Sequence, residues 1–202
     1  MTQIVVLIDW QNAYQQARNA FGLDDAAQER GTVSPLKLAQ VLAQRSAGHR
    51  ARLIKIEVHR GLPDPRRQRT ANSAALRQRD AWEAEAPGIV VPKLRSLAYN
   101  PDTGEPEEKG VDVAIAVSSL EWTITARAER VIIFWRDSDL LPGIDTVCRL
   151  YGADKIQTAS WWSRSYWKRI PETPGVKNLG LDEETFLAVE TPVDYRPPPG
   201  GP

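Results

Sequence analysis

Five side chains of this sequence have the types and positions needed to hold a divalent metal ion. They are Asp9, Asn12, Asp112, Asp137 and Asp139. Asp9 directly follows an apolar run at residues 4–8, and Asp137 comes two residues after a second such run at residues 131–135. Carboxylates gathered at one place repel one another, so they stay ionised when cations neutralise them. Hard oxygen ligands suit Mg²⁺ or Mn²⁺, which can activate water and stabilise a phosphodiester undergoing displacement.

Each of these residues also has an ordinary structural explanation. Asp112 would interact with the dipole of the helix whose first turn it occupies. Asp139, which precedes Leu-Leu-Pro, has the position of a helix N-cap, and Asn12 could form an Asx turn. Asp9 is the strongest single candidate, because an acid after five apolar residues has little structural reason to be there.

The elements that would position these residues alternate between strand and helix, which predicts a parallel sheet covered on both faces. The β-branched run at residues 4–8 is typical of a central strand buried on both faces. Further strands are predicted at residues 52–58, 89–91 with an extension toward 97, 131–135 and 155–159. Helices are predicted at residues 11–21, 35–47, 66–86, 111–125 and 141–151, and a turn-rich loop at residues 100–108. The predicted fold is a three-layer α/β/α sandwich, in which ligands bind beyond the carboxyl ends of the strands.

The composition changes near residue 170. Residues 1–170 are predicted to form the α/β domain. Residues 171–202 are a Pro-rich extension with 7 of the 15 prolines. Within it, residues 181–189 are predicted to dock as one element and residues 196–202 to form a disordered tail.

The cysteine and histidine counts exclude several classes. A single cysteine, Cys148, cannot form an internal disulfide, and its apolar neighbours predict core packing. Two histidines argue against a zinc site and a His-based triad. The N-terminal apolar run is too short for a signal peptide or a membrane span, so the expectation is a cytoplasmic protein without membrane association.

Three segments resemble the NYN domain family of the PIN-like, metal-dependent ribonuclease superfamily. Residues 8–12, Ile-Asp-Trp-Gln-Asn, resemble the Asp-x-x-Asn start of these domains. Residues 108–115, Glu-Lys-Gly-Val-Asp-Val-Ala-Ile, are similar to their Lys-Gly-Val-Asp-Val helix start. Residues 136–142, Arg-Asp-Ser-Asp-Leu-Leu-Pro, resemble their Gly-Asp-Ser-Asp-Phe-x-Pro motif. All three occur in the right order within about residues 3–160.

The resemblance implies a PIN-like fold and an endoribonuclease that depends on Mg²⁺ or Mn²⁺. It implies that the five residues named above form the catalytic site, with the four aspartates as metal ligands. Two departures matter, because Trp10 replaces the usual Gly and Trp135-Arg136 replace Ser-Gly. These residues are expected to place bulk beside the metal pocket. PIN-like sites often add an acid from the middle of the chain, and Asp80 and Glu83 are open candidates, although a solvated helix face explains both.

An acidic pocket needs a basic rim to hold RNA. Arginines follow the second predicted strand, and two further basic residues lie in the motifs, so the expected RNA-binding set is Arg60, Arg66, Arg67, Arg69, Lys109 and Arg136. Arginine pairs with phosphates bidentately, although a solvated helix face would have the same composition. Lys+Arg and Asp+Glu both number 26, so any such surface must be local.

Residues 161–169 mix aromatic and basic side chains, as in a base-stacking platform, or as in a sheet edge covered by the C-terminal segment. Core packing is predicted for Trp161 or Trp162.

The residues at the end of the first strand also bear on two other classes of α/β protein. A receiver-like domain would have an acid pair at the end of the first strand, and a haloacid-dehalogenase-like phosphatase would have Asp-x-Asp there, so residues 9–12 disfavour both. A catalytically silent NYN scaffold that binds RNA or a protein partner stays open. The choice between single-stranded and structured RNA also stays open, as does formation of a homodimer.

Overall fold

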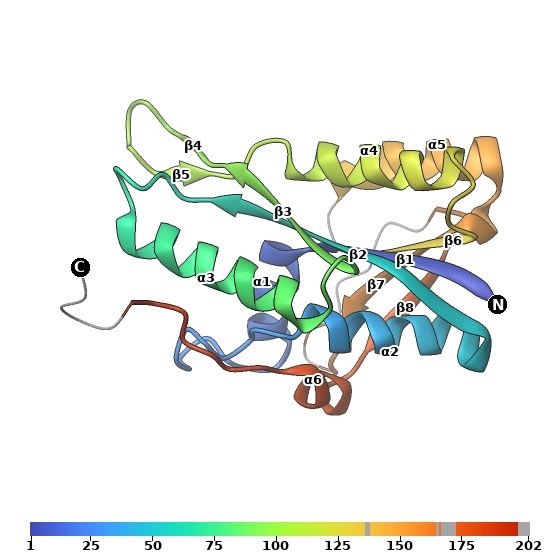
Figure 1. Ribbon diagram of the computed structural model, residues 1–202, viewed down its shortest axis with the longest axis horizontal. Helices are drawn as coiled ribbons and strands as arrows, with labels where there is room; N and C mark the ends of the chain where they lie inside the picture. The colour runs from blue at the N-terminus through green and yellow to red at the C-terminus, as the bar shows by residue number, and fades with distance from the viewer. Residues whose placement is uncertain (136–137, 165, 167–172, 198–202) are drawn as a thin grey trace.

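The computed structural model describes residues 1–135, 138–164, 166 and 173–197. In this part of the chain the main sheet has six strands in the order β3-β2-β1-β6-β7-β8, all paired in parallel (Figure 1). The strands are β1 (Thr2–Asp9), β2 (Ala51–Leu62), β3 (Val90–Ser96), β6 (Arg130–Phe134), β7 (Ile156–Trp161) and β8 (Lys177–Leu181). The predicted parallel sheet with the first strand in an interior position is confirmed.

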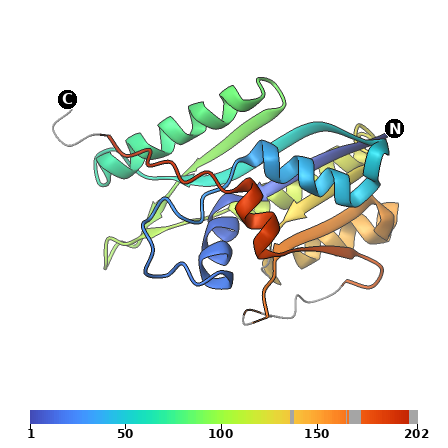
Figure 2. The same ribbon diagram turned by 90° about the horizontal axis from the view of Figure 1, so that it is seen from below.

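Helices cover both faces of this sheet. They are α1 (Trp10–Ala20), α2 (Pro35–Ala47), α3 (Arg69–Glu85), α4 (Val111–Ile124), α5 (Leu141–Tyr151) and α6 (Glu183–Val189). Figure 1 shows α4 and α5 on one side of the sheet and α2, α3 and α6 on the other, and Figure 2 views the second group from below. The predicted three-layer α/β/α sandwich is therefore confirmed. None of the helices in the described ranges has the length and apolar character to cross a membrane.

The central strand β1 explains the two-sided core. Ile4, Val6 and Ile8 pack with α1, α2 and α3, whereas Val5 and Leu7 pack with α4 and α5. All five side chains are fully buried. A strand with helices on both faces needs apolar residues at every position, which is why the run has no polar alternation.

The second helix begins as its sequence predicts. The Ser34 hydroxyl accepts a hydrogen bond from the Lys37 N–H at 3.2 Å, and Pro35 occupies the first helical position. A serine N-cap followed by proline satisfies an end donor and presets the helical φ.

The chain departs from prediction around the second and third strands. β2 continues to Leu62, four residues beyond its predicted end, because β3 pairs with it as far as Ser96. α3 begins at Arg69 rather than residue 66, after a turn in which the Asp64 carboxylate accepts from the Arg66 N–H. The predicted loop at residues 100–108 includes the turn and second strand of a small antiparallel hairpin, formed by β4 (Ala98–Tyr99) and β5 (Pro106–Glu107).

The Pro-rich extension contributes to the sheet itself. β8 pairs with β7 and buries Leu179 and Leu181, and α6 buries Phe186 against the same core. The predicted docking element is therefore preceded by the strand β8. The sequence did not predict this strand, because Leu179 and Leu181 are its only buried apolar positions. Arg196 lies within the predicted tail, yet it forms ion pairs with Asp194 at 2.8 Å and Glu29 at 4.0 Å. Residues 198–202 lie outside the described ranges.

Candidate functional site at the carboxyl edge of the sheet

Asp9 is the last residue of β1, and its side chain caps the helix that follows. Asp9 Oδ1 accepts a hydrogen bond from the Asn12 N–H at 2.9 Å, which makes Asp9 the N-cap of α1. The expectation that Asp9 lacks a structural role is therefore wrong. A carboxylate has two oxygens and about four lone-pair sites, so a capping hydrogen bond uses only part of its acceptor capacity. Asp9 is 6 % exposed, so its carboxylate is largely buried at the end of β1.

Asn12 lies inside α1 rather than in an Asx turn. Its Oδ1 accepts a hydrogen bond from the amide of Gln16, one turn further along the helix. The capping bond from Asp9 ties its backbone to the end of β1. Both residues thus belong to one short, internally bonded segment at the carboxyl end of the central strand.

Asp112 and Asp139 lie at the starts of two helices that pack side by side, Asp112 inside the first turn of one and Asp139 just before the other. Asp112 is in the first turn of α4, and Asp139 lies in the short 3-10 helix η2 (Ser138–Leu140), which contacts α4. A Cβ on Gly143 would lie 2.9 Å from the Cβ of Ala116, so the two helices approach closely there. Each aspartate precedes this contact by four residues, or about one helical turn. The two acids therefore lie at a similar level of the carboxyl edge.

The structure supports the purely structural role considered for Asp112 and not the one considered for Asp139. Asp112 occupies the first helical turn, where a carboxylate interacts favourably with the helix dipole. Asp139 is exposed and is not the N-cap of α5, because Leu140 has that position without a side-chain cap. The prediction of an N-cap role for Asp139 is wrong.

The predicted neighbour relation of the two acidic strand ends is confirmed for the strands themselves, since β1 pairs with β6 through Ile8 and Phe134. Asp137 and Arg136 lie outside the described residues. Among the residues that the structure describes, no three His, Cys, Asp or Glu side chains are close enough together to hold a metal ion.

The two tryptophans expected beside the metal pocket are core residues instead. Trp10 is 3 % exposed, and its ring centroid lies 4.4 Å from that of Trp82 on α3. Trp135 is fully buried in the core beneath α4 and α5. Burial of these large apolar surfaces is sufficient to explain their presence.

A buried polar pair on β2 was not predicted. His59 is 3 % exposed, and its Nε2 lies 3.3 Å from Glu57 Oε2. Trp122 Nε1 donates a hydrogen bond to the other carboxylate oxygen of Glu57 at 3.2 Å. Burial raises the pKa of Glu57, but interactions with His59, Trp122, Ser118 and Lys93 outweigh it and bring the pKa to about 2. Glu57 is therefore a buried, ionised carboxylate beneath α4.

The pairing register of the sheet places the Glu57–His59 pair next to the candidate site. His59 pairs with Asp9 on one side and with Lys93 of β3 on the other. The signal in the sequence is the alternation of Glu57 and His59 with Ile56 and Val58, which places polar side chains on one face of a buried strand.

Glu108 is the additional acid that the structure brings to this edge. Its Oε1 accepts a hydrogen bond from the Gly61 N–H at 2.6 Å. Burial raises the pKa of Glu108, Gly61 and Arg60 lower it, and the nearby charge of Asp112 raises it further. The candidates Asp80 and Glu83 lie 11 and 14 residues into α3, about 16–21 Å from its start at the carboxyl edge. They are exposed and do not join the site.

The predicted RNA-binding residues lie around the extended end of β2. Burial lowers the pKa of Arg60, opposed by the charge of Glu108, and its guanidinium donates to Gln78. Arg67 stacks over Tyr99 with 4.6 Å to the ring centroid, and Lys109 pairs with Glu107 at 3.2 Å.

Arg66 and Arg69 are exposed near the start of α3. β2 continues three residues past His59, the register partner of Asp9, which corresponds to about 10 Å. The segment that carries the two arginines, at the start of α3, is therefore offset from Asp9 along the strand direction.

Residues 161–169, which mix aromatic and basic side chains, differ in burial on the two sides of the end of β7. Trp161 is 1 % exposed, and its Nε1 donates to the Ala13 carbonyl at 2.9 Å, which confirms core packing. Trp162 is 45 % exposed, and Tyr166 packs partly against the core beneath α1 and α2. Residues 165 and 167–169 lie outside the described ranges.

Comparisons with known proteins support the fold. Neither protein-family models nor curated proteins give a match. A crystal structure of a protein of unknown function from Vibrio parahaemolyticus is similar, with a TM-score of 0.56 at 16 % sequence identity. The similarity covers 90 % of this chain and 93 % of that one. At this identity the likeness shows a shared fold alone.

Proposed function

We propose that this protein is a metal-dependent endoribonuclease that hydrolyses RNA phosphodiester bonds at the carboxyl edge of its sheet. The observation that carries the proposal is the placement of Asp9, Asp112 and Asp139 on three elements that begin or end at this edge. The resemblance of the three acidic segments to NYN domains points to the same chemistry. A cytoplasmic location belongs to the same proposal.

The chemistry of the donors fits Mg²⁺ or Mn²⁺. Asp9, Asp112, Asp137 and Asp139 would hold the ions through hard carboxylate oxygens. Bound ions would supply an activated water and charge neutralisation at the phosphate. The chain adds the N-termini of α1 and α4, whose helix dipoles favour an anionic substrate.

A nuclease assay tests this proposal. Wild-type protein should cut a panel of single-stranded and hairpin RNAs with Mg²⁺ or Mn²⁺ and lose this activity in EDTA. Asp112→Asn should reduce cleavage by at least about 100-fold, because a metal ligand is removed. Glu121→Gln is a matched control, since Glu121 is an exposed acid in the last turns of the same helix.

Two outcomes would contradict the proposal. One is cleavage by Asp112→Asn at the wild-type rate. The other is RNA binding by the wild type without turnover in either metal, which is the behaviour of a catalytically silent scaffold.

A further inference from the structure

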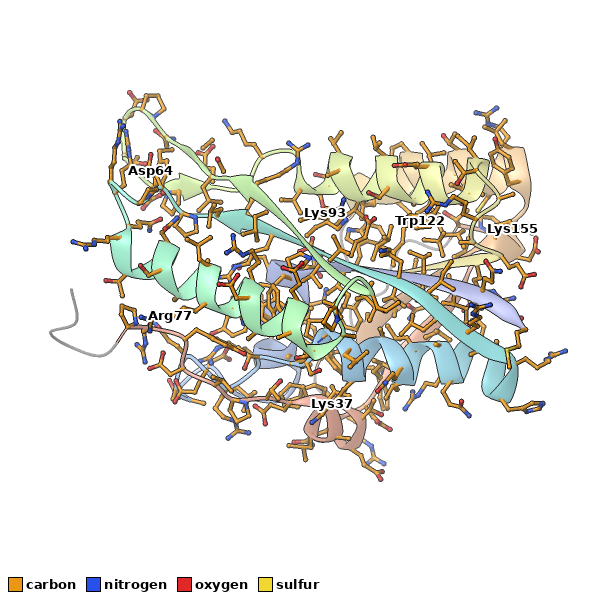
Figure 3. All side chains as sticks on the ribbon, in the orientation of Figure 1. Lys37, Asp64, Arg77, Lys93, Trp122 and Lys155 are labelled. Carbon is orange, nitrogen blue, oxygen red and sulfur yellow. The ribbon has the colours of Figure 1, made fainter. Side chains whose placement is uncertain are left out.

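A groove of about 840 Å³ lies between the edge strand β3 and helix α4. His59 lines it together with residues of β3 and the exposed side of α4. Figure 3 shows Lys93 in the space between the sheet and α4, near Trp122. The groove exists because α4 packs mainly over β1, β2 and β6, so this face of β3 has no helix of its own among the described residues.

The groove lies at the same level of the sheet as Asp9 of the candidate site. Asp9, His59 and Lys93 form one row across three neighbouring parallel strands. Strands in a sheet lie about 4.8 Å apart, so the backbone of Lys93 is about 10 Å from that of Asp9. An acid proposed to hold metal ions and an exposed cation are thus separated by two strand spacings at the same level of the sheet.

Arg95 adds a second cation at the start of α4. Its Nη1 lies 3.5 Å from the position that a Cβ on Gly110 would occupy. Gly110 is the N-cap of α4, two residues before Asp112, and its φ of 77° is a left-handed conformation that favours glycine. The guanidinium of Arg95 therefore lies beside the helix terminus that carries a proposed metal ligand.

The two cations differ from three of the six predicted RNA-binding residues. Arg60, Arg67 and Lys109 are already engaged by Gln78, Tyr99 and Glu107, respectively. Within the described ranges, Lys93 and Arg95 form no ion pair at 4.0 Å or less, and both are exposed. Lys93 also lowers the pKa of the buried Glu57, although this long-range effect needs no direct contact.

The other wall of the groove is apolar. Val113 and Val117, one turn apart on α4, are 64 % and 57 % exposed. An apolar wall opposite two cations suits a ligand with an anionic backbone and less polar sugar and base faces. A protein partner would find the same apolar wall, but it would not explain the row from the acidic site to the cations.

We propose that the groove between β3 and α4 binds the phosphodiester backbone of single-stranded RNA beside the scissile phosphate, with Lys93 and Arg95 as the phosphate contacts. This inference rests on the proposed ribonuclease function, because it extends the substrate path from that site. The proposal also assigns the main RNA contact to this groove, which is level with Asp9, and not to Arg66 and Arg69 near the start of α3.

Binding is measured separately from cleavage. The probe is a fluorescein-labelled single-stranded RNA of about 12 nucleotides, with Ca²⁺ replacing Mg²⁺ and fluorescence anisotropy followed at several salt concentrations. The double variant Lys93→Ala/Arg95→Ala should weaken binding at least about tenfold and flatten the salt slope by about 1.4, or 0.7 for each lost contact.

Two variants serve as controls. Arg66→Ala/Arg67→Ala removes the same charge outside the groove and should have the smaller effect on binding. Lys93→Arg/Arg95→Lys keeps the charge and should bind like wild type. Thermal unfolding checks that each variant is folded.

The outcomes separate the two proposals. If the wild type cuts RNA and Lys93→Ala/Arg95→Ala binds and cuts like it at every salt concentration, the groove proposal is overturned and the ribonuclease proposal stands. If the wild type binds RNA without cutting, and only the groove variant loses binding, the groove is supported as an RNA site and the ribonuclease proposal fails. If the wild type binds no RNA, both are overturned.

Discussion

Replacement of Asp9 separates the two roles assigned to its carboxylate. Asparagine and aspartate are about equally good N-caps, so Asp9→Asn should keep the hydrogen bond to the Asn12 N–H at the start of α1. Asp9→Ala removes it and should cost about 1 kcal/mol, within the range of 0.5–2 kcal/mol for lost N-caps. For a chain of this length, 1 kcal/mol corresponds to about 2–4 °C in Tm. Both variants should lose at least about 100-fold in cleavage, because an amide or a methyl group replaces a metal ligand.

Thermal unfolding with and without Mg²⁺ gives a readout that does not depend on turnover. A ligand that binds only the folded state stabilises it by about 2.7 kcal/mol at a concentration of 100 times Kd. Wild-type protein should therefore melt at a higher temperature in Mg²⁺, whereas Asp9→Asn should show little of this shift. Equal stabilisation of both proteins by Mg²⁺ would refute the assignment of Asp9 as a ligand. An Asp9→Asn protein that melts as low as Asp9→Ala would refute the argument from capping.

Two further predictions concern the polar and apolar contacts beneath α4. The pKa of Glu57 is about 2 against an ordinary 4.5, so its ionisation stabilises the fold above pH 4.5 and this contribution is lost as pH falls from 4.5 toward 2. The difference of about 2.5 units corresponds to at most about 3 kcal/mol. In urea unfolding the wild type should lose more stability between pH 7 and about pH 3 than Glu57→Gln does, and parallel pH profiles would contradict this. Gly143→Ala places a methyl group against Ala116 and should cost about 1–3 kcal/mol, minus up to about 1 kcal/mol of gained helix propensity. Ala116→Gly should restore part of that loss in a double-mutant cycle, and a Gly143→Ala protein as stable as wild type would show that α5 moves aside freely.

Local patterns were sufficient to predict most of the elements. The apolar run of β1 predicts a strand buried on both faces, because only a strand with helices on both sides excludes polar residues at every position. Ser34 and Pro35 predict the start of α2, because N-capping depends on residues adjacent in sequence. The positions of the acids at strand ends and helix starts were also predicted, because they depend on residues adjacent in sequence. The alternation of strands and helices predicts the three layers.

Tertiary structure decided which side chains meet. The row of Asp9, His59 and Lys93 depends on pairing and register among three strands that are distant in sequence. The strand β8 has only two buried apolar positions, and it becomes a strand because the edge of β7 is available to it. Glu57 stays ionised inside the protein because His59 on the same strand and Trp122, from a helix 65 residues later, both interact with its carboxylate. Such contacts follow from packing of distant segments, and no local pattern specifies them, which is why the sequence pointed to the acids at this edge while the structure identified their basic and histidine neighbours.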